Sequence, residues 1–169
     1  MFNDGMTCFQ STAFASIALA LVGAGSAQQL ATRRVLTLEV AKKIAAAAET
    51  EAVKNKWTMY ITVVDDSGLP VYIERIDETQ LGSFEVSMEK ARSAVLFKRP
   101  TKVFEDQVAG GRAGVLKLPG ALPVEGGIPL MADGKVIGGI GVSGGTSSQD
   151  GQVAQAGVAA LETMLKAGK

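Results

Sequence analysis

The chain has 169 residues, with 17 Lys and Arg balanced by 17 Asp and Glu, no histidine and a single cysteine, Cys8. This length predicts one domain with a substantial core. Zero net charge and an aromatic content of 5% argue against a broad nucleic-acid surface or a base-stacking platform. The composition also excludes an intrachain disulfide, zinc and iron–sulfur sites built on Cys or His, and a histidine general base. A cation site made of carboxylates alone is still compatible with it.

The N-terminal segment has the pattern of an export signal. Residues 11–22 (STAFASIALALV) are apolar over the length of a signal h-region, and the small residues Gly25–Ala27 suit a signal peptidase. The apolar segment is too short to span a bilayer comfortably, so we expect no stable membrane span. Asp4 departs from the usual positive n-region. We predict that residues 1–27 are a signal peptide and that residues 28–169 form one periplasmic or secreted domain; the alternative is an apolar helix retained for docking or membrane attachment.

The next segment predicts a helix followed by a β-hairpin. Apolar residues, mostly alanine, recur at helical spacing after the N-cap candidate Thr37, which indicates a helix near residues 38–55. Residues 57–64 (WTMYITVV) are aromatic and β-branched and predict a strand. The turn residues Asp65–Gly68 then lead into a return strand at residues 71–73. The alternative for Asp65 and Asp66 is a carboxylate pair for chemistry or for a cation.

A second helix is predicted over residues 82–97. Its apolar face is expected to consist of Phe84, Met88, Ala91 and Val95, which follow i, i+4, i+7 and i+11 spacing. Glu85, Glu89 and Arg92 lie on the opposite side with Lys90 beside them. We interpret these charges as a solvated face with local ion pairs.

The remainder predicts a short helix, an irregular segment, a second hairpin and a final helix. Pro100 starts a helix over residues 101–108. Residues 110–127 contain too many Gly and Pro for a long element but are too apolar for a free linker, so we expect a loop folded onto the core, lining a pocket or a subunit interface. Asp133-Gly134 predicts a hairpin turn between strands, and helical spacing resumes from Val153. The order of elements predicts an α+β domain with an antiparallel sheet covered by helices.

Glycines are concentrated in the last predicted strand and in the loop after it. Residues 139–144 match G-x-G-x-x-G, but the first two glycines lie inside a strand, which excludes a dinucleotide fingerprint. Gly138, Gly139 and Gly141 instead indicate close approach by a helix, a ligand or a neighbouring subunit. Ser143, Gly144, Gly145 and Thr146 precede the final helix, where they could hold a carboxylate or phosphate, or could simply cap the helix.

Two stretches together resemble a known family. Residues 118–150 (LPGALPVEGGIPLMADGKVIGGIGVSGGTSSQD), and Lys90-Ala91-Arg92 followed by Phe97, Arg99, Pro100 and Thr101, are similar to the GlcG/HbpS family of small haem-binding proteins. The resemblance extends over about residues 36–165. It implies a profilin-like fold, an antiparallel β-sheet flanked by α-helices, in homo-oligomers. It also implies haem as a possible ligand, but some related domains bind the iron through histidine, which this chain lacks.

Three functional hypotheses follow. The first is haem binding, with residues 115–124 as an apolar slot and Arg112, Lys117 and residues 143–146 as anion contacts; the axial ligand would then be a Tyr, Met or Lys side chain, or an oxygen donor such as Thr146. The second is an enzyme acting on a small carboxylated or hydroxylated molecule, with Glu125 as a carboxylate base. Its further candidate groups are Lys90, Arg99, Arg112 and Asp150. The third is a non-catalytic oligomeric interaction module.

Overall fold

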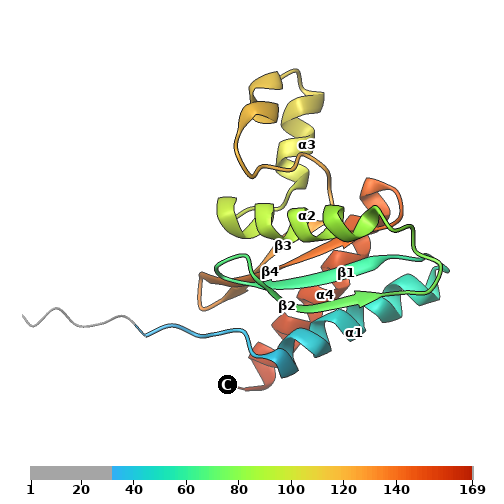
Figure 1. The fold of residues 1–169 in the computed structure, drawn as a ribbon. Coiled ribbons are helices and arrows are strands. Elements are labelled where there is room, and N and C mark those ends of the chain that lie inside the picture. The colour runs from blue at the N-terminus through green and yellow to red at the C-terminus, as the bar shows by residue number, and fades with distance from the viewer. Residues whose placement is uncertain (1–31, 169) are drawn as a thin grey trace, which may run out of the picture. The chain divides into compact units, whose positions relative to one another are not determined.

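The computed structural model describes residues 32–168 (Figure 1), so the predicted signal peptide and Cys8 lie outside the described residues. The α-helices are α1 (Leu38–Lys54), α2 (Ser83–Phe97), α3 (Lys102–Ala109) and α4 (Ser147–Ala167), with a short 3-10 helix at Ala113–Lys117. The strands are β1 (Tyr60–Asp65), β2 (Pro70–Arg75), β3 (Gly127–Ala132) and β4 (Lys135–Ser143). Among these residues, no helix combines the length and the hydrophobicity needed to cross a membrane.

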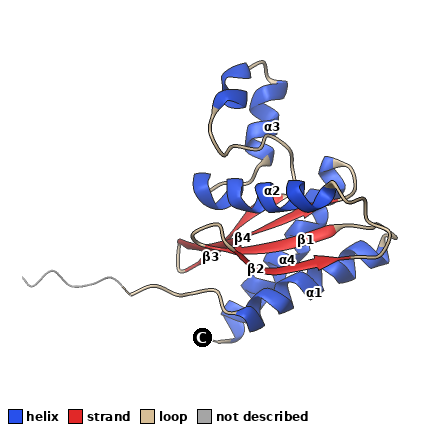
Figure 2. Ribbon diagram, in the orientation of Figure 1, coloured by secondary structure: helices blue, strands red, loops and turns tan. Residues whose placement is uncertain are grey.

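The strands form one sheet in the order β2-β1-β4-β3, in which every neighbouring pair is antiparallel. The two predicted hairpins are therefore joined through their β1 and β4 strands. Helices α1 and α4 cover one face of the sheet and α2 covers the other (Figure 2). The predicted α+β architecture is confirmed.

The main core lies between the sheet and the α1–α4 layer. Thr37 caps α1 by accepting a hydrogen bond from the N–H of Val40, as its position predicts. The apolar face of α1 is mostly alanine, and Ala41, Ala45 and Ala48 are fully buried. These small side chains let α1 lie close to α4 and to the sheet.

The glycines of β4 make room for α2 on the opposite face. A Cβ on Gly139 would lie 2.8 Å from the carbonyl oxygen of Ala91, and a Cβ on Gly141 would overlap the carbonyl oxygen of Ser87. Because real Cβ atoms do not approach so closely, only glycine allows the helix to rest on this strand. The sequence predicted an alanine-rich helix, a ligand or a neighbouring subunit beside these glycines; the element that packs on them is α2, which is not alanine-rich.

The buried face of α2 differs from the predicted one. Ala91 and Val95 are buried as predicted, but the other buried positions carry Ser83, Ser87, Lys90, Ser93 and Ala94. Phe84 and Met88 are only half-buried. The assignment of Lys90 to a solvated face was wrong, because its side chain is 1% exposed. The polar groups are tolerated inside because they are satisfied there, as shown by the 2.8 Å hydrogen bond between the Ser87 and Thr62 hydroxyls.

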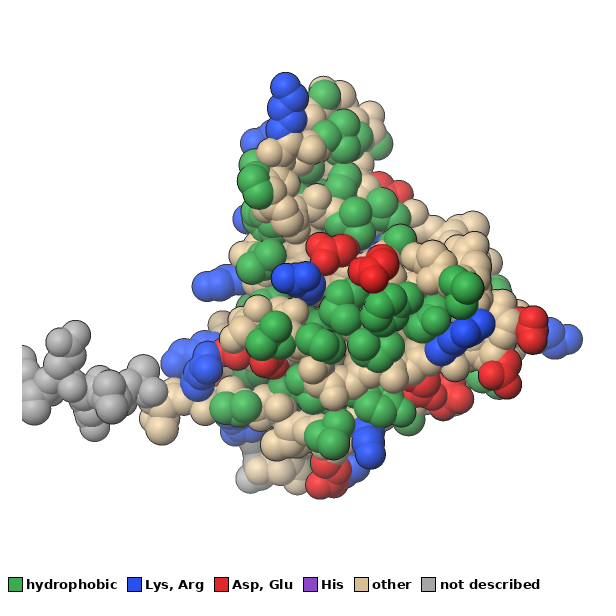
Figure 3. Space-filling view, viewed as in Figure 1, with side chains coloured by type: hydrophobic (Ala, Val, Ile, Leu, Met, Phe, Trp, Pro, Cys, Tyr) green, Lys and Arg blue, Asp and Glu red, His purple; other side chains and the backbone are tan. Residues whose placement is uncertain are grey.

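The segment between α3 and β3 forms a projection above α2 (Figure 1). Val115 is buried in it, but Leu116 and Leu118 are exposed, and hydrophobic side chains are visible over the projection in Figure 3. The N–H of Leu122 donates to Ser93 Oγ at 3.0 Å, which ties the returning chain to α2. The expectation of a loop folded onto the core therefore holds only in part.

Candidate functional site

Two pockets among the described residues differ in chemistry. The first, which we call the edge groove, has a volume of about 420 Å³ and lies where β3, an edge strand, begins beside the first turns of α4. Glycines and apolar residues line it together with polar side chains, which are Lys102, Glu125, Ser148, Gln152 and Gln155. Of the predicted site residues, Glu125 lines it directly.

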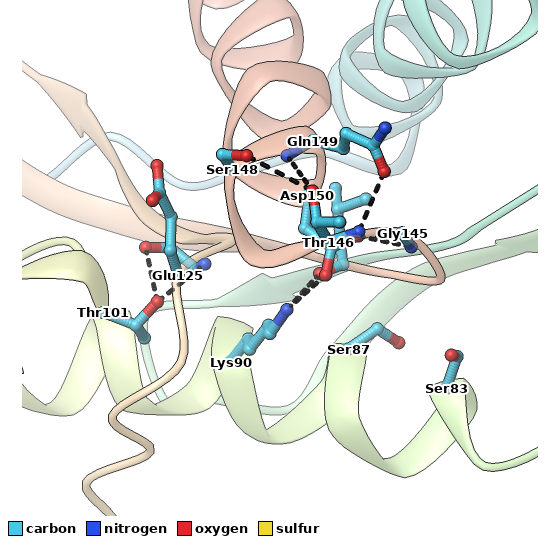
Figure 4. Close-up of polar contacts among 12 residues, drawn as sticks. Ser83, Ser87, Lys90, Thr101, Glu125, Gly145, Thr146, Ser148, Gln149 and Asp150 are labelled. Carbon is cyan, nitrogen blue, oxygen red and sulfur yellow. Dashed lines mark hydrogen bonds and ion pairs between the residues drawn. The ribbon is translucent and has the colours of Figure 1, made fainter. Parts of the chain in front are cut away.

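A buried ion pair lies directly behind the edge groove (Figure 4). Lys90 Nζ donates to Asp150 Oδ2 at 2.6 Å and to the carbonyl oxygen of Val142 at 3.0 Å. The two charged side chains are only 1% and 4% exposed. A Cβ on Gly126, which lines the groove, would lie 2.9 Å from Lys90 Nζ. The pair thus connects α2, β4 and α4 beneath the groove.

The Asp150 carboxyl is shifted by its surroundings in opposing directions. Burial raises its pKa, while the Lys90 ammonium and the Gly145 N–H, which donates to Asp150 Oδ1 at 2.9 Å, lower it. The burial effect is the larger, so the pKa of Asp150 lies above its ordinary value.

The loop at residues 143–146 uses its polar groups within the chain. Its Gly145 N–H binds the carboxylate of Asp150. Thr146 and Gln149 form a capping box, in which the Gln149 side chain accepts from the Thr146 N–H and the Thr146 hydroxyl accepts from the Gln149 N–H. Of the two roles that the sequence allows, helix capping is the one seen here, and binding of an external anion at this loop stays a prediction.

Main-chain and hydroxyl hydrogen bonds hold the start of β3 in place beside the groove. Thr101 exchanges two hydrogen bonds with Gly127, because its N–H donates to the Gly127 carbonyl and its hydroxyl accepts from the Gly127 N–H, each at 2.9 Å. The Gly126 carbonyl in turn accepts from the Val142 N–H at 2.9 Å. These bonds fasten the start of β3 to α3 and β4. Thr101 stood in a quoted motif, but sequence reasoning gave it no role.

Glu125 is half-buried in the edge groove. Its side chain lies against Gly151, where a Cβ would overlap the carboxylate. Its main-chain N–H donates to Glu105, but its carboxylate has no hydrogen-bond or ion-pair partner among residues 32–168. Lys102, the nearby cation, is bound to Asp106 at 2.7 Å. Glu125 is therefore a carboxylate that is available to a ligand.

Two predicted contacts lie elsewhere. Arg99 donates to the carbonyl oxygen of Phe97 at 3.1 Å and stands 5.7 Å from the ring centroid of Phe104. Arg112 is exposed at the start of the 3-10 helix. Neither residue lines the edge groove. The structure brings Lys90, Glu125 and Asp150 together and leaves these arginines apart.

The second pocket, which we call the hairpin pocket, has a volume of about 590 Å³. It lies between the C-terminal end of α2 and the two hairpin turns. Both turns are at the left end of the sheet in Figure 1. It is lined by Asp66, Val95, Lys98, Met131, Gly134, Lys135 and Val136. Of these residues, the sequence suggested a chemical role for Asp66 alone, as the alternative to a turn former.

The acidic residue of the hairpin pocket has an ion-pair partner, whereas its two lysines have none among the described residues. Asp66 is bound to Arg33, whereas Lys98 and Lys135 have no carboxylate within ion-pair distance in the described part of the chain. Lys98 is the C-cap of α2 and has a left-handed backbone conformation, with φ of 51°. Residues 32–168 hold no group of three or more Cys, Asp or Glu side chains suited to a metal ion.

The chain is similar to proteins of one family over most of its described length. The family model described as haem degrading protein HbpS-like matches residues 36–159. Protein GlcG of Escherichia coli K12 is 41% identical over 112 residues, which cover 66% of this chain and 84% of GlcG. Corrinoid adenosyltransferase PduO of Salmonella typhimurium is 33% identical over 120 residues, and the match covers 68% of this chain but only 35% of PduO.

Solved structures agree with the sequence matches. HbpS has a TM-score of 0.70 and 35% identity, covering 78% of this chain and 93% of HbpS. A complex of PduOC with haem has a TM-score of 0.68 and 30% identity, covering 75% of this chain and 95% of PduOC. The chain therefore belongs to the HbpS-like family, as its two sequence motifs predict.

Proposed function

We propose that this chain is a haem-binding protein and that haem occupies the hairpin pocket. The family is haem-binding, and the solved relative PduOC is in complex with haem. The observation that carries the choice of pocket is the pair Lys98 and Lys135, two lysines without carboxylate partners that face one cavity.

The hairpin pocket fits the chemistry of haem. Haem is a flat apolar ring with two propionates, and Val95 and Val136 supply apolar walls while the two lysines supply cations for the propionates. The volume of about 590 Å³ lies within the usual range for ligand pockets, roughly 300–1,000 Å³. When bound, haem would supply a redox-active iron.

The edge groove fits haem less well. Its volume is smaller, about 420 Å³, and its lysine, Lys102, is already bound to Asp106. The unpaired carboxylate of Glu125 would repel the propionates of haem. Both charge and size therefore support the choice of the hairpin pocket in this proposal.

Haemin titration followed by absorption tests this function. We expect wild-type protein to bind haem saturably at one per chain. The double variant Lys98→Gln/Lys135→Gln should bind about fivefold to tenfold more weakly, because each partly exposed ion pair contributes up to about 1 kcal/mol. The matched control is Lys42→Gln/Lys56→Gln, which removes two exposed lysines; Lys56, like Lys98, has a positive φ, of 59°. Wild-type protein that shows no saturable binding would rule out the function.

A second candidate function rests on the carboxylate of Glu125. This side chain, held against Gly151 without a partner, supports an enzyme in which Glu125 acts as a base toward a small carboxylated or hydroxylated molecule in the edge groove. A substrate screen with Glu125→Gln tests it. Turnover that survives this change would exclude Glu125 as the base.

We also propose that the protein is exported and forms homo-oligomers. The apolar segment at residues 11–22 supports export, and the exposed side chains of Leu96, Leu116 and Leu118 support self-association. Native mass spectrometry of protein isolated from its cells reports both properties. A subunit that still contains residues 1–27 would contradict export, and a monomer at micromolar concentration would contradict self-association.

A further inference from the structure

We propose that the thioether sulfur of Met131 is an axial ligand of the haem iron. The inference rests on the proposed haem binding and names the iron ligand within the hairpin pocket. The question is posed by the sequence itself, because a chain without histidine lacks the side chain that most often holds haem iron.

The geometry of β3 places Met131 in the hairpin pocket. Its neighbours Leu130 and Ala132 are buried in the core on the α1–α4 side of the sheet. Because side chains alternate along a strand, Met131 faces the opposite side, where α2 lies. The β3–β4 register shifts between Leu130 and Met131, and such a bulge re-aims a side chain at the edge of a sheet. Met131 is consequently 41% exposed and lines the cavity.

The other described methionines are not available to haem in the same way. Met59 is completely buried in the main core. Met88 is half-buried and packs beneath α2 against Val64, Ala91 and Val95. Met164 lines a different cavity of only about 210 Å³. Met131 is the one methionine in residues 32–168 that is more than one-third exposed and lines one of the larger pockets.

The other side chains of the hairpin pocket that could bind iron have different partners or functions in this proposal. Lys98 and Lys135 are the two side chains that this proposal assigns to the haem propionates, so neither is assigned to the iron. Asp66 is bound to Arg33. Tyr60 and Tyr72 do not line this pocket. The sulfur of Met131 is left as the uncharged donor that the iron can meet.

A thioether ligand has a measurable consequence. Thioether sulfur is a soft donor, and methionine ligation raises the reduction potential of haem iron. Met131 is therefore expected to favour the ferrous state in this protein. Removing the sulfur while keeping the size of the side chain should shift the potential downward without altering the fold, because Met and Leu are similar in volume.

The test compares haem-loaded wild-type protein, Met131→Leu and the control Met88→Leu. We expect wild-type protein and Met88→Leu to show the sulfur-to-iron charge-transfer band of ferric haem and the same reduction potential. Met131→Leu should lose the band, have a lower potential and bind ferrous haem about tenfold more weakly. A Met131→Leu protein with the wild-type spectrum and potential would overturn the inference.

A second variant keeps the test decisive. Met131→His places a nitrogen donor at the same position, and we expect it to give haem a spectrum that shows nitrogen ligation. A Met131→His spectrum identical to that of Met131→Leu would overturn the inference, because the position would then not reach the iron. Failure of wild-type protein to bind haem at all is a separate outcome, and it overturns the proposed function itself.

Discussion

Replacing Lys90 with methionine should lower the free energy of unfolding by about 3–5 kcal/mol at pH 7. The change removes the partner of Asp150, whose side chain is 4% exposed, and leaves an uncompensated charge in the interior. The control is Arg92→Met, which breaks an ion pair between Arg92 and Glu89 on the exposed side of the same helix. That change should cost less than about 1 kcal/mol, because surface ion pairs contribute little. Urea unfolding curves of the two variants measure the difference.

The Lys90→Met variant should also respond to pH in a defined direction. Burial already raises the pKa of Asp150 in the folded protein, and removing Lys90 removes an opposing effect. The folded variant then binds a proton at a pH where the unfolded chain does not, so its stability rises as pH falls toward the folded pKa. We therefore expect a smaller loss at pH 5 than at pH 7. An equal loss at both values would contradict a charged Asp150 as the cause.

Replacing Gly141 with alanine should cost about 3 kcal/mol or more, at the upper end of the overpacking range. The new Cβ would overlap the carbonyl oxygen of Ser87 and would lie 2.5 Å from the main-chain nitrogen of Ala91. These are backbone atoms of α2, and the helix cannot move away easily because the Ser87 hydroxyl is bound to Thr62 across the interface. The helix must either shift from the sheet or remain strained.

Gly114→Ala is the matched control for this change. No atom lies within 4 Å of a Cβ built on Gly114, and its φ is not in the left-handed region. We expect its stability to differ from wild type by less than about 0.5 kcal/mol. Thermal and urea unfolding of both variants test the explanation. A Gly141→Ala protein as stable as the control would show that α2 does not depend on the glycines of β4.

The fold was predictable from the sequence because its strongest signals are local. The alanine spacing of α1 and the turn at Asp133-Gly134 each follow from local backbone geometry. The buried face of α2 was not predictable in this way. Ser87 and Lys90 are polar residues whose burial depends on partners 25 and 60 positions away in the chain, which spacing alone does not reveal.

The candidate site shows the same division. Glu125 and Asp150 belong to one motif, and the structure brings them together with Lys90 around the edge groove. The hairpin pocket was not predictable from the sequence, because Lys98 and Met131 come together only when α2 packs against the second hairpin. The sequence places Met131 and Lys135 on either side of the hairpin turn. This position does not indicate a pocket, because the other wall consists of Val95 and Lys98 at the end of α2.

Paramagnetic broadening in NMR spectra of the haem-loaded protein tests the central claim most directly. Ferric haem broadens signals of nearby nuclei, and a diamagnetic gallium protoporphyrin serves as the reference. With haem in the hairpin pocket, signals from Val95, Lys98 and residues 131–136 should disappear, while those of residues 125–128 at the edge groove persist. Loss of the edge-groove signals with an unchanged hairpin pocket would contradict the account.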